Sequence, residues 1–349
     1  MNKHGGYRGN NKKMLDFSIN INPLGMPPEL REKLIDAFDD LGKYPEITGD
    51  SARKKIATDI GMPEENVILG NGAIELIYLF ARSIKLKSAL IPVPTFNEYK
   101  RALVMNGWQN VHEMVIGFEN GFTLDAEVLK KEIERCKPQV IFICNPTNPT
   151  GKLYKKKFLT ELMDTCDPKI IWFIDESFIE FSGIETCMNL VRESEHHLFL
   201  LRSMTKFFGL PGLRIGYGIG SKSIVEAMNS HKEPWTINTL ALTAAANVYD
   251  YKDYIDQTKH MVNSERIRVF EALSNIRELE VLPSGADFHL YRVKKGTAKD
   301  LQKKLNTYNI NVRTCEDFAG LETHYFRAAI KKPEDNDRLI SALKEIFKK

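Results

Sequence analysis

The chain has 349 residues, 43% of them hydrophobic and 27% charged, which is typical of a globular protein with a sizeable core. Its 49 lysine and arginine residues nearly balance 46 acidic residues, and the net charge of +3 argues against a nucleic-acid-binding surface. The opening residues lack the apolar segment of a signal peptide, and no run approaches about eighteen apolar residues. We therefore expect a soluble cytoplasmic protein without a nucleic-acid or membrane partner.

The cysteines and histidines carry no recognisable ligand pattern. The five cysteines contain no CxxC pair, and their scatter is typical of a reducing compartment. The histidines show no spacing of metal ligands, so the sequence predicts no metal site.

From about residue 66 to 220, short apolar runs alternate with helical patterns. The runs are apolar on both faces, which predicts buried and largely parallel strands. They lie at 67–69, 89–93, 140–144, 170–174, 198–201 and 215–219, and the helices at 73–83, 97–105, 126–136 and 156–165. This alternation predicts an α/β layered sheet.

After about residue 250 the pattern changes. A long helix at 254–276 precedes strands at 279–282 and 289–293, a helix from Ala298 and a last helix from Pro333. This order predicts a smaller α+β domain, which the segment 15–35 joins from the other end of the chain. We predict an N-terminal arm with part of the small domain at 1–43, a large domain at 44–249 and a small C-terminal domain at 250–349.

Polar clusters follow several of the predicted strands, where ligands of open α/β sheets bind. The first, 70–75, is a glycine turn opening a helix whose N-terminus could hold a phosphate, although Gly-Asn-Gly is also an ordinary turn. The second, 145–151, has two prolines that fix the backbone while Asn148 offers an amide donor, unless it is a plain turn. The third begins at Asp175, whose carboxylate is costly to bury unless a cation, such as a protonated heterocyclic nitrogen, pairs with it.

The fourth cluster spans 202–217 and contains Lys206 between a strand and aromatic residues. That setting could lower the pKa of the amine and make it nucleophilic. Ser203 and Arg214, in the same cluster, are natural phosphate ligands.

Together the four clusters resemble the fold-type I pyridoxal-phosphate enzymes of the aspartate aminotransferase superfamily, over nearly the whole chain. The resemblance implies a large domain with a mainly parallel seven-stranded sheet flanked by helices, plus a smaller α+β domain. It also implies that Lys206 forms a Schiff base with pyridoxal 5'-phosphate and that Asp175 pairs with the ring nitrogen. Asn148 would bond the phenolic oxygen, and Phe96 would stack on the ring unless it only packs in the core.

The resemblance extends to the cofactor phosphate and to the quaternary structure. It implies a homodimer in which Tyr44 reaches the cofactor phosphate of the neighbouring subunit. The residues implied near the cofactor of the same chain include Gly72, Ala73, Ile74, Ser203, Thr205 and Arg214.

The start of the chain resembles one branch of this superfamily. His4-Gly5-Gly6 and residues 16–25 resemble the N-terminus of the threonine-phosphate decarboxylases of cobalamin biosynthesis, which are relatives of histidinol-phosphate aminotransferases. Phe178 stands where many aminotransferases carry a tyrosine. The decarboxylases resemble this chain in carrying a phenylalanine there. This likeness implies decarboxylation of L-threonine O-3-phosphate to (R)-1-amino-2-propanol O-2-phosphate, the precursor of the cobalamin linker.

We expect the acidic groups of the substrate to be bound by Arg327 and by Arg313 or His4, with Asn20 and Asn148 assisting. An arginine fork suits carboxylate and phosphate equally, so either arginine can bind either group. His4 could instead be a disordered terminal residue. The alternative functions are a histidinol-phosphate-type aminotransferase, a decarboxylase of L-serine O-phosphate and a non-catalytic regulator that binds the cofactor.

Overall fold

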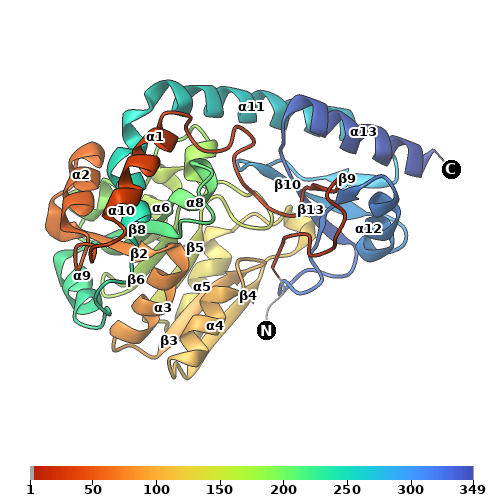
Figure 1. The fold of residues 1–349 in the computed structure, drawn as a ribbon. Helices are drawn as coiled ribbons and strands as arrows, with labels where there is room; N and C mark the ends of the chain where they lie inside the picture. The colour runs from red at the N-terminus through yellow and green to blue at the C-terminus, as the bar shows by residue number, and fades with distance from the viewer. Residues whose placement is uncertain (1–3, 349) are drawn as a thin grey trace.

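The computed structural model describes residues 4–348, and the larger part of this region is built on a seven-stranded sheet (Figure 1). The strand order is β2-β8-β7-β6-β5-β3-β4. All neighbouring strands are parallel except that β8 is antiparallel to both β2 and β7, so the expected α/β fold with a mainly parallel sheet is confirmed. The strands are β2 (Val67–Asn71), β3 (Ser88–Val93), β4 (Asn110–Val115), β5 (Val140–Cys144), β6 (Ile171–Asp175), β7 (His197–Ser203) and β8 (Ile215–Gly220).

Helices cover both faces of this sheet because its central strands are apolar on both sides. In β5, Phe142 packs on one face with α3 (Ala73–Ser83) and α4 (Glu98–Met105). Ile141 packs on the other face with α5 (Ala126–Cys136) and its neighbours. The remaining helices of this part are α2 (Asp50–Ile60), α6 (Lys156–Asp164), α7 (Leu190–Glu193), α8 (Met204–Phe207), α9 (Lys222–Asn229) and α10 (Thr239–Asn247), with short 3-10 turns at Ala37–Asp40, Glu64–Asn66, Phe118–Asn120, Ile179–Phe181 and Val248–Asp250.

A second, antiparallel sheet follows residue 250, with strand order β12-β13-β10-β9. Its strands are β9 (Leu279–Val281), β10 (Phe288–Val293), β12 (Arg313–Thr314) and β13 (Tyr325–Ala329). The helices α11 (Lys252–Ser274) and α13 (Pro333–Phe347) run side by side along this end of the molecule (Figure 1), and α12 (Ala298–Thr307) packs beside them. The long helix and the strands expected here are therefore present.

The segment near the start of the chain divides between the two parts. The short strand β1 (Leu15–Asp16) pairs in parallel with β11 (Ile310–Asn311), as expected for a segment that joins the C-terminal part. The helix α1 (Leu30–Asp36) packs instead against α10 of the larger part. The domain boundaries at residues 43 and 249 remain predictions.

No helix within residues 4–348 is both long and apolar enough to cross a bilayer. The longest, α11, begins at Lys252 and carries charged residues throughout its length.

Candidate active site

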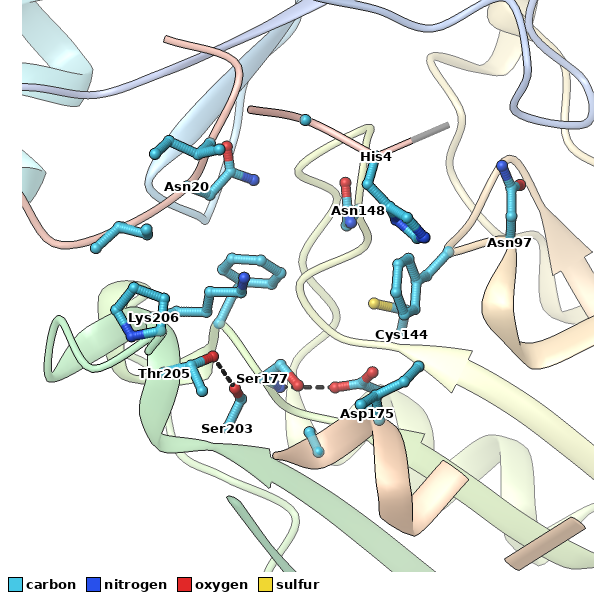
Figure 2. Close-up of a pocket in the computed structure, with 18 of the residues that line it drawn as sticks. His4, Asn20, Asn97, Cys144, Asn148, Asp175, Ser177, Ser203, Thr205 and Lys206 are labelled. Atoms are coloured by element: carbon cyan, nitrogen blue, oxygen red, sulfur yellow. Dashed lines mark hydrogen bonds between the residues drawn. The ribbon is translucent and has the colours of Figure 1, made fainter. Parts of the chain in front are cut away.

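A cavity of about 370 Å³ lies at the carboxyl ends of β5, β6 and β7, closed on its other side by residues of the second sheet and of the N-terminal segment. Figure 2 shows Lys206 and Thr205 at one end of the cavity, with Asp175 and Ser177 along its floor. The structure thus brings together nearly all the predicted site residues, which are His4, Asn20, Ala73, Ile74, Phe96, Asn148, Asp175, Ser203, Thr205, Lys206, Arg214, Arg313 and Arg327. Gly72 and Tyr44 do not line the cavity.

Lys206 reaches the cavity from α8, the short helix that directly follows β7. Its backbone carbonyl accepts a hydrogen bond of 3.0 Å from the amide of Asn22, which ties the N-terminal segment to this helix. Burial lowers the pKa of its amine, and the opposing pull of Asp287 does not cancel that effect. The pKa therefore moves in the direction that the sequence predicted, toward a nucleophilic amine.

Asp175 ends β6, and its carboxylate is buried on the cavity floor. The Tyr99 hydroxyl donates to Oδ2 over 2.6 Å, and the Ser177 amide donates to Oδ1 over 2.8 Å. Burial raises the pKa of this carboxyl, while the two donors favour the ionised form. An anion so placed suits a protonated ring nitrogen.

The end of the cavity that holds Lys206 and Thr205 gathers hydrogen-bond donors suited to a phosphate. Gly72, at φ +75°, precedes α3, and a Cβ built there would lie 2.3 Å from Nη2 of Arg214. Only glycine leaves room for that guanidinium over the first turn of the helix. The hydroxyls of Ser203 and Thr205 lie 2.8 Å apart beside it (Figure 2), and Ala73 opens the helix.

Two further side chains suit an aromatic ring that lies between this group of donors and Asp175. The ring of Phe96 lines the cavity and packs edge-on against Tyr99, with 5.7 Å between centroids. The Asn148 side-chain oxygen accepts a hydrogen bond from Arg327, so its amide N–H₂ is the group it can offer to the cavity. The donor set, the anion and the amine together fit pyridoxal phosphate.

Cations approach the remaining wall of the cavity from the second sheet. Arg327 of β13 donates from Nη2 to the Ser18 carbonyl over 2.9 Å, while its Nε is buried without a hydrogen-bond partner in residues 4–348. Burial lowers the pKa of Arg327 to about 10. Arg313 of β12 donates to Asp317 over 2.8 Å and lines the same wall.

The N-terminal segment completes the cavity. His4 lines the cavity, and its Nε2 lies 3.4 Å from the buried carboxylate of Glu98. Asn20 also lines the cavity, and its Oδ1 is buried without a hydrogen-bond partner among the described residues. The backbone amides of Gly6 and Tyr7 are held by Ser18 and Asp16.

Three groups near the cavity were not among the sequence predictions. Tyr99 holds Asp175, and Ser177 adds a backbone donor. Asp287 is the acidic neighbour with the strongest pull on the Lys206 amine. Tyr99 follows Phe96 by one helical turn and could have been found by that spacing, whereas a lone aspartate in a turn gives no such signal.

Tyr44 lies away from the cavity on the surface. Its side chain is 85% exposed, and its ring packs against Trp235 with 5.4 Å between centroids. Its expected contact with the cofactor of a neighbouring subunit remains a prediction.

Comparison with known proteins finds a family model and relatives that match nearly the whole chain. The family model described as "Aminotransferase class I and II" matches residues 12–343. A provisionally named threonine-phosphate decarboxylase from Caldanaerobacter subterraneus subsp. tengcongensis is 37% identical, covering 94% of this chain and 89% of that protein. The threonine-phosphate decarboxylase of Salmonella typhimurium is 34% identical, covering 96% and 92% respectively. The crystal structure of the histidinol-phosphate aminotransferase from Clostridium acetobutylicum superposes with a TM-score of 0.88, at 32% identity over 96% of this chain and 99% of that one.

Proposed function

Because the chain belongs to the aminotransferase class I and II family and is an enzyme that uses pyridoxal phosphate, we propose that it decarboxylates L-threonine O-3-phosphate. The product would be (R)-1-amino-2-propanol O-2-phosphate, which would supply the aminopropanol linker of cobalamin. The names of two relatives that match nearly the full chain support this assignment, as does the likeness of the N-terminal residues.

The structural observation that carries the proposal is the pair of buried arginines facing one cavity. Arg313 and Arg327 both line the wall opposite the sheet ends, in the same cavity as Lys206. Two guanidinium groups match a substrate with two acidic groups, one carboxylate and one phosphate. His4 adds a third group that can carry positive charge.

The residues of the chain would have the following roles in the reaction. The cofactor, when bound, supplies a ring that accepts the electron pair of a bond broken at the substrate Cα. Asp175 holds the proton on the ring nitrogen, and Lys206 provides the amine that anchors the cofactor. The arginines would hold the acidic groups and so determine which bond at Cα is placed for cleavage, and placing the bond to the carboxylate would select decarboxylation.

After carbon dioxide leaves, Cα needs a proton. Lys206 lines the same cavity, and its Nζ, when protonated, would be the group that supplies this proton. That transfer would break one N–H bond, form one C–H bond and leave a neutral amine on Lys206.

A second candidate is a histidinol-phosphate-type aminotransferase, which the close superposition with the Clostridium acetobutylicum structure favours. It would use the same cofactor residues but remove the Cα hydrogen. Within the decarboxylase reading, L-serine O-phosphate differs from the proposed substrate by one methyl group, worth about 1–3 kcal/mol of discrimination.

The deciding experiment incubates the purified protein and pyridoxal phosphate with threonine phosphate or serine phosphate, without a keto acid. Release of carbon dioxide and formation of aminopropanol phosphate from threonine phosphate support the proposal, and Lys206→Ala should release none while retaining its thermal midpoint. A strict need for a keto acid would establish the aminotransferase. Cofactor binding without turnover of any amino acid would favour a regulator.

We also propose that the enzyme is a cytoplasmic homodimer. Tyr44 and Trp235 lie exposed together, as expected for side chains that a second subunit covers.

A further inference from the structure

Glu98 is a buried acidic residue beside the cavity that takes no part in the mechanism above. It opens α4, directly after Phe96 and Asn97, and only 2% of its surface is exposed. A buried carboxylate is costly unless hydrogen-bond donors or cations compensate its charge. Next to a site for an anionic substrate, an uncompensated carboxylate would also repel that substrate.

Two donors hold one oxygen of this carboxylate. The Tyr78 hydroxyl of α3 donates to Oε2 of Glu98 over 2.7 Å, and Nη1 of Arg101 donates to the same oxygen over 3.1 Å. Burial and the neighbouring carboxylate raise the pKa of Tyr78 to about 12, so the hydroxyl keeps its hydrogen at neutral pH. These contacts fix the Glu98 side chain between α3 and α4.

The other oxygen of Glu98 faces His4. Nε2 of His4 lies 3.4 Å from Oε1, which is the distance of an ion pair and longer than an ordinary hydrogen bond. The His4 side chain is 47% exposed, and Figure 2 shows it pointing from the N-terminal segment toward the cavity. Its ring also lies beside Phe96, with 6.4 Å between centroids. The contact therefore joins the N-terminal segment to α4 at the wall of the cavity.

The backbone next to His4 is held from a different direction. The amide of Gly6 donates to Oγ of Ser18 over 2.8 Å. A Cβ built on Gly5 would lie 2.2 Å from the carbonyl oxygen of Ser18, so the two stretches of chain touch directly. Loss of the Glu98 carboxylate would thus release the imidazole ring of His4 while the backbone beside it stays in place.

The chemistry of imidazole suggests what the contact is for. The group that binds one ring nitrogen of a histidine determines what the other nitrogen can offer. A carboxylate oxygen only accepts, so Oε1 of Glu98 favours a hydrogen on Nε2 of His4. A protonated ring carries a hydrogen on both nitrogens, and it could donate to Glu98 and to an acidic group of the substrate together. Its positive charge would then separate the two anions.

We propose that Glu98 is a positioning residue that holds the imidazole of His4 in place for an acidic group of the substrate. Glu98 does not line the cavity itself, so it would act through His4. The inference rests on the proposed function, which supplies a substrate with two acidic groups. The competing explanation is that Glu98 only joins α3 to α4 through Tyr78, and it predicts effects that do not depend on His4.

The test is a double-mutant cycle of Glu98 and His4 in the full-length protein loaded with pyridoxal phosphate. The ligand is the analogue of threonine phosphate that lacks only the amino group, so it keeps both acidic groups and cannot react with the cofactor aldehyde. Titration calorimetry measures its dissociation constant. Glu98→Gln should weaken binding by about tenfold, because glutamine has one acceptor oxygen for donors that arrive from two sides. With His4→Ala already present, the same substitution should cause no further loss.

Glu265→Gln is the matched control. Glu265 of α11 is also a buried glutamate, it pairs with an arginine three residues later, and Asn336 donates to it over 2.8 Å. It does not line the cavity, so its substitution should leave the dissociation constant of the analogue unchanged.

Three results would overturn the proposal. They are unchanged binding in Glu98→Gln, the same loss with and without the His4 side chain, and an equal loss in Glu265→Gln. If Glu98→Gln does not fold, Glu98→Asp takes its place in the cycle, since it withdraws the carboxylate from His4 by one methylene group. Its loss of affinity should likewise disappear in the His4→Ala background.

Kinetics separate this inference from the proposed function. If the wild type decarboxylates threonine phosphate, Glu98→Gln should raise KM by about tenfold with little change in kcat, because binding of the substrate is what is weakened. A wild type that binds the analogue but releases no carbon dioxide would contradict the proposed function, while the binding cycle would still decide the role of Glu98.

Discussion

Among single residues, Tyr99 connects two parts of the proposed cofactor site, since its hydroxyl donates to Asp175 and its ring packs against Phe96. Tyr99→Phe removes one of the two donors to a buried carboxylate, so burial should raise the pKa of Asp175 further. Loss of a hydrogen bond to a charged group costs about 1.5–3 kcal/mol, so kcat/KM should fall tenfold or more, in line with about 1.4 kcal/mol per decade. The acid limb of the pH profile of kcat/KM should move to higher pH.

Tyr78→Phe is the control for this change. The Tyr78 hydroxyl donates to Glu98 over 2.7 Å and not to Asp175. Its acid limb should coincide with that of the wild type. An unshifted profile in Tyr99→Phe would show that the hydroxyl does not sustain the charge of Asp175.

The burial of Asp287 also predicts how the stability of the protein depends on pH. Its pKa in the folded chain is about 6, raised by burial from an ordinary value of 3.8. The folded protein therefore holds this proton more tightly, and stability should fall as pH rises from about 4 to 6, by about 3 kcal/mol at 1.36 kcal/mol per pH unit. Asp287→Asn lacks this loss. Urea unfolding should show that the free energy of unfolding of Asp287→Asn rises relative to that of the wild type between pH 4 and pH 7. A difference in unfolding free energy that is the same at both pH values would contradict the assignment.

Residues differ in how far the sequence could identify them. Lys206 and Asp175 follow buried strands, so their places at the sheet edge could be predicted from hydrophobic pattern and from the family resemblance. Asp287 could not, because an aspartate that follows Ser284-Gly285-Ala286 is typical of an exposed turn. Its burial depends on α11 and β13, which only the tertiary structure brings to it.

Among the elements, the first turn of α3 depends on one glycine. Gly72→Ala places a Cβ at φ +75° and 2.3 Å from Arg214, so the guanidinium must move out of the proposed phosphate site. We expect the affinity for pyridoxal phosphate to fall by at least about tenfold, since a charge-assisted contact is lost. Equilibrium dialysis of the full-length protein measures this change.

Gly61→Ala separates backbone strain from this clash. Gly61 also has a positive φ, +67°, but nothing lies within 4 Å of a Cβ built there. It should lower stability by about 1 kcal/mol while leaving cofactor affinity unchanged. Equal losses of affinity in both variants would indicate that strain alone matters.

The edge of the large sheet shows where pattern reasoning failed. Strand β4, Asn110–Val115, pairs with β3 but was not among the predicted strands. Most of its side chains are exposed or half-buried, so it lacks the continuous apolar run that identified the central strands. The seven-stranded sheet was anticipated through family resemblance rather than through this segment.

For the whole molecule, a surface near the N-terminus predicts how subunits associate. Phe38 and Leu41 are more than half exposed and precede Tyr44 along the same surface segment. Phe38→Asp should weaken the proposed dimer by tenfold or more, because burial of such a side chain contributes about 1.5–3 kcal/mol. Sedimentation velocity measures the change. Met105→Asp, at an exposed apolar residue on α4, should leave the mass of the assembly unaltered, and a wild-type monomer would contradict the dimer.

At this scale the sequence predicted an α/β layered part followed by an α+β part. It could not predict that α1 packs on α10 while the strand before it pairs with β11. Segments far apart in sequence meet through surfaces that a linear pattern does not specify.

The position of His4 bears on how measured rates should be interpreted. Because His4 lines the cavity, a change at this residue acts directly on the proposed substrate site. Helix α13, in contrast, lies at the margin of the molecule (Figure 1). Kinetic constants from a preparation with an altered His4 would therefore describe an altered site.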